Sequence, residues 1–175
     1  MLFRSPEGCQ GKIDFLFVIS SSGGMTGHQE QLHASLPEFI TAIESNFSEF
    51  DSHIMVVDTD DYWAMKDCSL CGPGCNANGQ PPLCNADLDP CDTTMGAGVI
   101  FPAGKDSSAR RCDLAAGRYI TREDPDPIAA FLCTAKLGSG GAADLPAAAM
   151  VAALSWPLLG TNGYPTGCNQ GFLRD

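Results

Sequence analysis

The sequence predicts an α/β domain of three layers, in which helices flank a mainly parallel sheet. Residues 13–19 are nearly all β-branched or aromatic, without the polar alternation of a strand that has one wet face. A loop of Ser and Gly, a helical pattern and a second apolar run at residues 53–58 follow. The first run therefore suits a central parallel strand that is covered on both faces, and ligands of such sheets bind beyond the carboxyl ends of the strands.

The first helix is predicted over residues 27–46. Thr26 and Gln29 have the spacing of a capping box, which opens a helix. Pro37 lies inside the pattern and is expected to kink the helix or divide it. Six apolar residues at helical spacing form the predicted buried stripe: Leu32, Leu36, Phe39, Ile40, Ile43 and Phe47.

Residues 64–112 are predicted to be a Cys-rich insertion within a single domain that spans residues 1–175. Gly, Pro, Asn and Asp dominate the insertion, and only residues 96–101 have the composition of a short strand. Residues 117–121 predict an edge strand that pairs near it.

Two further helices are predicted after the insertion. Asp126 as N-cap and Pro127 at the first helical position begin one of them. Asp144, with Pro146 in the first turn, begins the other. The residues expected to face the core are Ile128, Phe131, Leu132 and Ala135 in the first helix, and Met150, Ala153 and Leu154 in the second.

Several phrases of the sequence resemble a known family. An apolar strand, a loop similar to Asp-x-Ser-x-Ser with Gly and Met, and an amphipathic helix resemble the opening of a von Willebrand factor type A domain. The chain is similar in particular to cysteine-rich secreted type A proteins of myxobacteria and related Gram-negative bacteria. The phrases that carry this resemblance are KIDFLFVI, HIMVVDTD, GAGVIFPAGKDSSARRC, GRYIT, residues 133–153 and CNQGFLRD. It implies a Rossmann-like sheet, of which this chain holds the N-terminal half and ends before the fourth strand.

The resemblance also implies a site for a divalent cation, usually Mg²⁺, on the first loop. Ser20 stands where the family has Asp, Ser22 matches the first Ser, Gly24 replaces the second, and Ser139 is the candidate for the Thr of a later loop. The family's last Asp has no counterpart. A charge pair at about 4 Å is worth roughly 4 kcal/mol at a dielectric near 20, and a dication doubles the attraction, so hydroxyls do not replace carboxylates. We expect a degenerate site with weak Mg²⁺ or Ca²⁺ binding, or a polar turn alone.

Acidic clusters offer the second set of candidate metal ligands. Asp58, Asp60 and Asp61 lie at the end of the second strand and are expected to lie beside the first loop, with Asp58 and Asp60 as the candidate ligands. Asp87, Asp89 and Asp92 alternate in the insertion in a way that suits Ca²⁺. The alternative for both clusters is a turn whose carboxylates bond their own backbone.

The 9 Cys predict disulfides, because a loop with little apolar content needs covalent bridges. A zinc knuckle is the alternative, although the insertion contains no His. Cys133 and Cys168 are expected to pair, and the odd count leaves one thiol over, for which Cys9 is the candidate. The disulfide candidates are Cys68, Cys71, Cys75, Cys84, Cys91, Cys112, Cys133 and Cys168.

Composition limits the partners and the location. A net charge of −11 disfavours nucleic acid, and no apolar run reaches the length of a membrane span. The Cys content and the resemblance indicate an extracytoplasmic protein whose export signal lies outside this chain. In a half sheet the first strand has an open apolar edge, which favours self-association unless the tail from Leu158, with Phe172 and Leu173, covers it.

The function that follows from the resemblance is adhesion or protein interaction, with a protein or cell-surface ligand. A purely structural piece of a larger envelope protein is the alternative. The third reading is an enzyme, either a hydrolase that uses Ser22 and His28 or a thiol-redox protein that uses Cys68 and Cys71.

Overall fold

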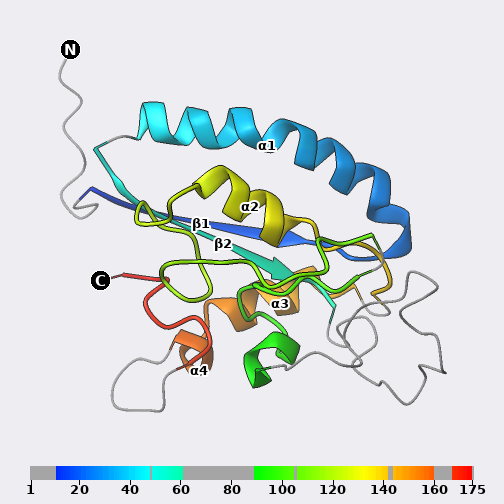
Figure 1. The fold of residues 1–175 in the computed structure, drawn as a ribbon. Coiled ribbons are helices and arrows are strands. Elements are labelled where there is room, and N and C mark those ends of the chain that lie inside the picture. The colour runs from blue at the N-terminus through cyan, green and yellow to red at the C-terminus, as the bar shows by residue number, and fades with distance from the viewer. Residues whose placement is uncertain are drawn as a thin grey trace.

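The computed structural model describes residues 11–47, 49–60, 89–104, 106–141, 144–159 and 167–174. These residues form a mixed α/β arrangement, as the sequence predicts (Figure 1). In chain order the elements are β1 (Lys12–Ile19), the 3-10 helix η1 (Gly23–Met25), α1 (Thr26–Asn46), β2 (Asp51–Asp58), the 3-10 helix η4 (Pro90–Thr93), α2 (Pro127–Ala135), α3 (Pro146–Ala153) and α4 (Trp156–Leu159).

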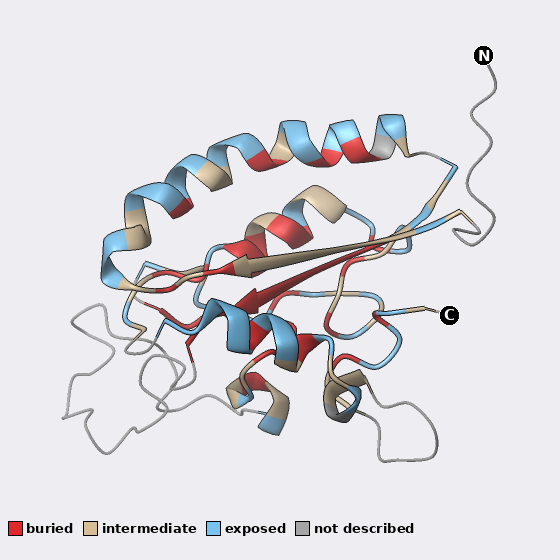
Figure 2. Cartoon of the chain, turned by 180° about the vertical axis from the view of Figure 1, so that it is seen from behind, coloured by how far each residue is buried: buried red, intermediate tan, exposed pale blue. Residues whose placement is uncertain are grey.

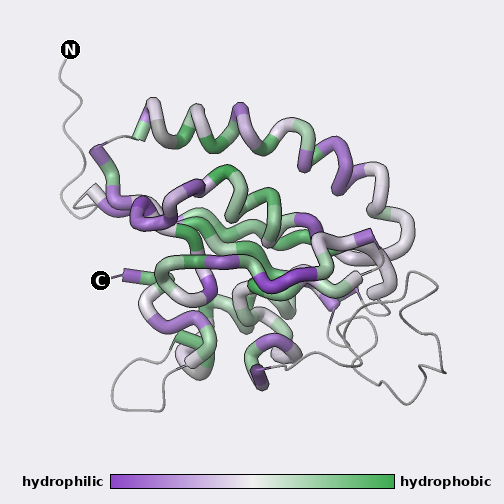
Figure 3. Tube along the Cα trace, viewed as in Figure 1, coloured by the Kyte–Doolittle hydropathy of each residue, from purple (hydrophilic) through white to green (hydrophobic). Residues whose placement is uncertain are grey.

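β1 and β2 form a parallel pair, so both strand predictions are confirmed. The register runs without a slip from Lys12 opposite Asp51 to Ile19 opposite Asp58. Successive side chains of a strand point to opposite faces, and the two cores follow this rule. Alternate residues of β2 pack with α1 and α2 on one face, and the intervening residues pack with α3 and the C-terminal segment on the other. Hydrophobic residues accordingly gather in the strands and in α2 (Figure 3).

β2, rather than β1, is the better-buried strand (Figure 2). Most of β1 is only half-buried, because in the part of the chain that the structure describes β1 pairs only with β2. Among the described residues β1 therefore lies at an edge of the sheet, as expected for a half sheet, and not between two strands. The outer edge of β1 carries no described partner strand, and self-association through this edge stays a prediction.

The short strands predicted at 96–101 and 117–121 do not form. Val99 N donates to Val56 O at 2.8 Å, and Ile120 exchanges two hydrogen bonds with Ile54, but these contacts stay isolated beside β2. The reason lies at the start of each segment. Gly96 has φ of 81° and Gly117 has φ of 94°, which takes the backbone out of the extended region.

Helix α1 begins at Thr26 and runs unbroken through Pro37, so the predicted division is wrong. Most of the predicted stripe is confirmed, because Leu36, Ile40 and Ile43 are buried. The exception is Phe39, which is exposed but meets the rings of two β1 phenylalanines edge-on. The capping box is also wrong: Met25 is the N-cap residue, and no side chain caps the helix.

Helix α2 begins as predicted, whereas α3 does not. The Asp126 carboxylate accepts a hydrogen bond from Ala129 N at 2.9 Å, and Phe131 is completely buried. In α3 the N-cap is Leu145 rather than Asp144, without a side-chain bond. Ala153 is buried as expected. The predictions for the other two core residues of this helix, Met150 and Leu154, are wrong, because they are 45% and 40% exposed.

Two disulfides join described residues. Cys91 binds Cys168, and Cys112 binds Cys133. The predicted Cys133–Cys168 pair is therefore wrong. Cys133 faces the segment at 108–112, where Ser108 Oγ also donates to the Cys133 carbonyl, and the terminal turn lies against η4 instead. The other candidates, Cys68, Cys71, Cys75 and Cys84, lie outside the described residues, as does Cys9.

The C-terminal segment, residues 167–174, covers a face of the sheet rather than its edge. Phe172 is completely buried against Met55 and Val57, while Leu173 is 43% exposed. Arg174 then donates to the Asp14 carboxylate at 2.6 Å and to Ile13 O at 3.1 Å. The expected cover for the β1 edge is thus not seen among the described residues.

Among the helices that the structure describes, none combines the length and the apolar character that crossing a bilayer requires.

Candidate functional site at the strand ends

The parallel register brings the two predicted loops together. Ile19 lies opposite Asp58, so the chain leaves β1 and β2 at the same edge of the sheet. The loop at residues 20–24 and the segment at 58–60 therefore start side by side. This is the position at which open α/β sheets bind ligands.

A buried hydrogen bond joins these two segments. Ser21 is 1% exposed, and its Oγ donates to Asp58 Oδ1 at 2.8 Å. The backbone N–H of Asp60 donates to the same oxygen at 3.2 Å. Burial raises the pKa of Asp58 from an ordinary 3.8 to about 6, and the nearby charge of Asp60 adds to it, although both hydrogen bonds oppose the rise. Asp58 therefore changes charge only just below neutral pH.

The turn at residues 138–141 closes over the first loop. Gly140 N and Gly141 N both donate to Ser21 O at 3.0 Å. Ser139, the predicted counterpart of a family Thr, is carried by this turn and is half-buried. The turn that carries Ser139 therefore contacts the first loop through backbone hydrogen bonds, and a role of Ser139 as a ligand stays a prediction.

Gln29 holds the loop and the turn together. Its Nε2 donates to Ser20 O at 2.6 Å and to Gly138 O at 2.9 Å, and its Oε1 accepts from Gly138 N at 3.0 Å. The side chain is buried. These three bonds use all of the amide in tertiary contacts, which explains why Gln29 does not serve the capping box that its spacing predicts.

The predicted ligand hydroxyls of the first loop satisfy each other. Ser20 Oγ donates to Ser22 Oγ at 3.2 Å, and Ser22 N donates to Ser20 Oγ at 3.2 Å. Both residues are half-buried, and the neighbouring Gly23 and Gly24 are exposed. The loop thus presents small polar groups and backbone to the outside.

The donor set does not fit a firmly held Mg²⁺. Hard cations require carboxylate oxygens, but the loop offers neutral hydroxyls, and the Asp58 carboxylate is already engaged and has a raised pKa. In the described ranges, no three His, Cys, Asp or Glu side chains are grouped so as to hold a metal ion. The residues brought together here bind one another instead.

Asp60 and Asp144 form a second contact at this edge, which the sequence did not indicate. Thr59 Oγ1 donates to Asp144 Oδ1 at 2.5 Å, and Leu145 N donates to Thr59 O at 2.9 Å. Asp60 is 2% exposed, and its backbone forms an isolated antiparallel β-bridge with Asp144. The Asp144 carboxylate is therefore occupied by Thr59, just after β2, which is why it does not cap α3.

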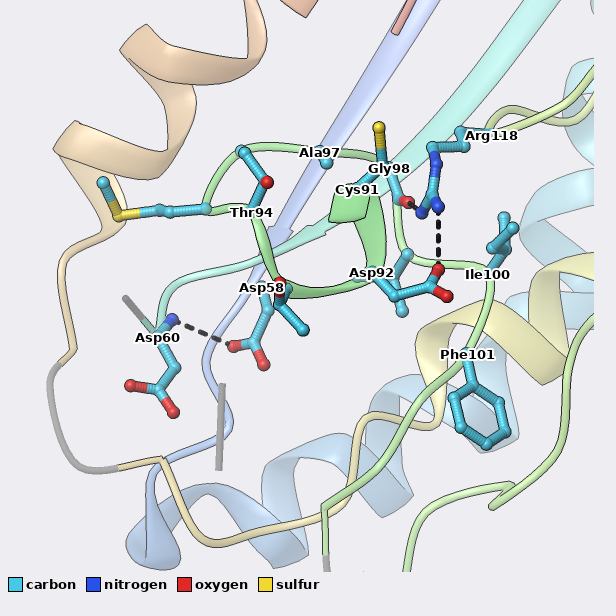
Figure 4. A pocket seen from close by; sticks show the side chains of 14 residues that line it. Asp58, Asp60, Cys91, Asp92, Thr94, Ala97, Gly98, Ile100, Phe101 and Arg118 are labelled. Atoms are coloured by element: carbon cyan, nitrogen blue, oxygen red, sulfur yellow. Dashed lines mark hydrogen bonds and ion pairs between the residues drawn. The ribbon is translucent and has the colours of Figure 1, made fainter. Parts of the chain in front are cut away.

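A small cavity of about 20 Å³ lies between the end of β2 and the loop after η4, enough for about one water molecule (Figure 4). Asp58 and Asp60 line one side, and an ion pair of Asp92 with Arg118 lines the other. Arg118 Nη2 and Arg111 Nη2 each lie 2.7 Å from a different oxygen of Asp92. Burial alone would raise the pKa of Asp92, but the hydrogen bonds of the two arginines outweigh it and lower the pKa.

Two carboxylates of the acidic cluster in the insertion, Asp89 and Asp92, are engaged by the turn at η4 and by the two arginines. Asp89 caps η4 by accepting from Cys91 N at 2.7 Å, and Asp92 Oδ2 accepts from Asp89 N at 3.0 Å. These two carboxylates thus serve the turn and the arginines, which is the turn-forming alternative. The third member, Asp87, lies outside the described residues.

The hydrolase hypothesis gains no support from the described geometry. His28 is exposed on α1, and the Ser22 hydroxyl interacts with Ser20. Cys68 and Cys71, on which the thiol-redox hypothesis depends, lie outside the described residues.

Replacing Gly141 by Ala is expected to destabilise the fold by about 2 kcal/mol. A Cβ at this position would lie 2.5 Å from Ser21 Oγ, so the side chain must move and lose its bond to Asp58. Urea unfolding of the oxidised chain measures the change. Gly24→Ala is the matched control, because a Cβ there meets nothing within 4 Å, and equal losses in both variants would contradict this packing.

Stability should fall as the pH rises through the titration of Asp58. Its folded pKa of about 6 exceeds the unfolded 3.8, so its favourable contribution is complete below pH 3.8 and is lost as the pH rises to about 6. The loss amounts to roughly 3 kcal/mol. Asp58→Asn should remove this loss, since Asn accepts the same two hydrogen bonds without titrating.

Urea unfolding at pH 4 and pH 7 compares the wild type, Asp58→Asn and the exposed control Asp113→Asn. At each pH the free energy of unfolding of the variant is subtracted from that of the wild type. This difference cancels the opposite pH dependence that Asp92 contributes to both proteins. If the free energy of unfolding changes with pH in Asp58→Asn as much as it does in Asp113→Asn, the raised pKa of Asp58 is contradicted.

Comparisons of the chain with protein-family models, with curated proteins and with solved structures found no match, so the candidate site rests on its geometry.

Proposed function

We propose that the chain is an extracytoplasmic protein-interaction module of the adhesion type, with a degenerate cation site. In this proposal the sheet is the N-terminal half of a Rossmann-like, three-layer type A fold. Support comes from the parallel β1–α1–β2 unit and from the helices on both faces of the sheet. The two disulfides indicate an oxidising compartment, which supports a location outside the cytoplasm.

The observation that carries the proposal is the rigid joining of two loops at the strand ends. Gln29 contributes three hydrogen bonds and Ser21 O accepts two, so residues 20–24 and 138–141 form one surface, here called the strand-end surface. Gly23, Gly24 and Gly140 are exposed on it. A surface that is ordered before binding loses little entropy when a partner docks, which favours recognition.

The partner is a protein or a cell-surface ligand that reads small polar groups and backbone rather than a metal ion. No carboxylate projects from the loop to hold a bridging cation, and the hydroxyls of Ser20 and Ser22 pair with each other. The net charge of −11 favours a partner with a basic surface, whose association should slow as salt increases.

Site-specific photocrosslinking tests this proposal. A photoreactive residue replaces Ser22 or Ser139 on the strand-end surface, or the exposed Ser45 near the other end of α1 as control. The oxidised protein is incubated with an envelope fraction of the source cells, with and without EDTA. The proposal predicts the same discrete adduct from both strand-end positions, unchanged by EDTA and absent from position 45.

Adducts that form equally from position 45 would contradict the location of the site. Adducts that EDTA abolishes would contradict recognition without a cation. The absence of any adduct from the two strand-end positions would favour the structural alternative, in which the chain has no ligand of its own.

A further inference from the structure

The exposed hydrophobic side chains of this protein are concentrated on one segment. Seven large hydrophobic residues are exposed in the part of the chain that the structure describes, and five of them fall between residues 145 and 156. They are Leu145 at 40%, Met150 at 45%, Val151 at 61%, Leu154 at 40% and Trp156 at 52%. Single exposed apolar residues are ordinary, but a contiguous group marks an interaction site.

Helix α3 is apolar on both its inner and its outer side. Ala149 and Ala153 are buried against the molecule, whereas Ala147, Val151 and Leu154 follow the helical spacing of a second stripe that faces outward. Figure 2 shows α3 on the near side of the molecule, with no described element in front of it. A helix that only covers its own core typically has a polar outer stripe, so an apolar outer stripe favours a further contact.

The segment at residues 145–159 also carries no charged side chain. No Asp, Glu, Lys, Arg or His occurs between residues 145 and 159, in a chain whose net charge is −11. Two copies of such a chain repel each other over most of their surface. They can approach through a surface that carries no charge, and an apolar patch complements itself across a two-fold axis. The centres of interfaces are likewise depleted in charge and enriched in Met and Trp.

We infer that α3 and the residues that flank it are a dimer interface, at which the outer stripe of α3 packs against the same stripe of a second copy. The short side chain of Ala147 allows close approach, and Val151 lies at the centre. The exposed side chains of Leu145, Met150, Val151, Leu154 and Trp156 are the surface that each copy contributes to an interface, and a specific interface buries at least about 1,000 Å² in total. This inference does not rest on the proposed function, because it uses none of the residues of the strand-end surface.

Sedimentation of the oxidised full chain tests the inference, over concentrations from about 1 µM to about 1 mM. The wild type should rise from its chain mass of 18.4 kDa toward twice that value. Added salt should strengthen the dimer, because it screens the repulsion and leaves the apolar contact intact. Val151→Glu should raise the dissociation constant at least tenfold, since it places a charge at the centre of the interface.

A matched pair of substitutions controls for charge and for folding. Ala148→Glu on α3 and Ala42→Glu on α1 make the same change at two exposed helical positions. Ala148→Glu should weaken the dimer like Val151→Glu, whereas Ala42→Glu should behave as the wild type, and all three should keep the wild-type unfolding transition. A wild type that stays monomeric throughout, or a dimer that Val151→Glu leaves intact, would overturn the inference.

Discussion

Asn169→Asp is expected to destabilise the protein by about 4 kcal/mol at pH 7. Asn169 is completely buried, its Nδ2 donates to Gly96 O at 2.8 Å and to Ala153 O at 3.1 Å, and its Oδ1 accepts from Gly98 N at 2.8 Å. One amide thus joins the C-terminal segment, the loop beside β2 and the end of α3. An ionised carboxylate has no donor for the two carbonyl oxygens and brings a charge into a completely buried position.

Urea unfolding of the oxidised chain measures this loss, and Gln170→Glu is the matched control. The neighbouring Gln170 is exposed, so the same change of amide to carboxylate should alter the free energy of unfolding by less than about 0.5 kcal/mol. The deficit of Asn169→Asp should shrink at low pH, because protonation removes the charge and restores one donor. Equal effects of the two variants would contradict the central position of Asn169.

Gln29→Glu is expected to destabilise the protein by about 3 kcal/mol and to loosen the strand-end surface. The carboxylate would still accept from Gly138 N, but it would face Ser20 O and Gly138 O without a hydrogen to donate. Gln31→Glu, at an exposed position of the same helix, makes the same change of charge and should be nearly neutral.

Amide hydrogen exchange separates the local effect from the global one. Gly140 N and Gly141 N donate to Ser21 O, so their exchange should accelerate in Gln29→Glu more than that of the β2 amides. Uniform acceleration over the whole chain would mean that Gln29 contributes stability without organising the loops.

The sequence predicted the elements that local pattern controls. The apolar runs gave both strands, and the stripe on α1 and the Asp126 cap gave two helices close to their observed starts. The two failed helix caps share a cause, because each predicted capping residue binds a partner that is distant along the chain. Gln29 binds Gly138 instead of capping α1, and Asp144 binds Thr59 instead of capping α3.

The candidate site was predicted in position but not in composition. Parallel strands that end side by side predict that the first loop meets the segment after β2, and the register confirms this. Two residues that hold the site together, Ser21 and Gln29, have neutral side chains, and neither the loop motif nor the capping-box spacing indicates their contacts. The sequence signal that could have indicated the contact is the run Gly138-Ser139-Gly140-Gly141, because Gly141 lies too close to Ser21 for any larger residue.

The central claim is that hydrogen bonds, rather than a bound cation, organise the loops at the strand ends. The most direct test is thermal melting of the oxidised chain in EDTA and then in Mg²⁺, Ca²⁺ or Mn²⁺. We predict no shift beyond about 1 °C, with one cooperative transition. A cation at a hundred times its dissociation constant would add roughly 2.7 kcal/mol, which is several degrees for a domain of this size. A shift of that size that Ser22→Ala abolishes would contradict the claim and show that the loop still holds a metal ion.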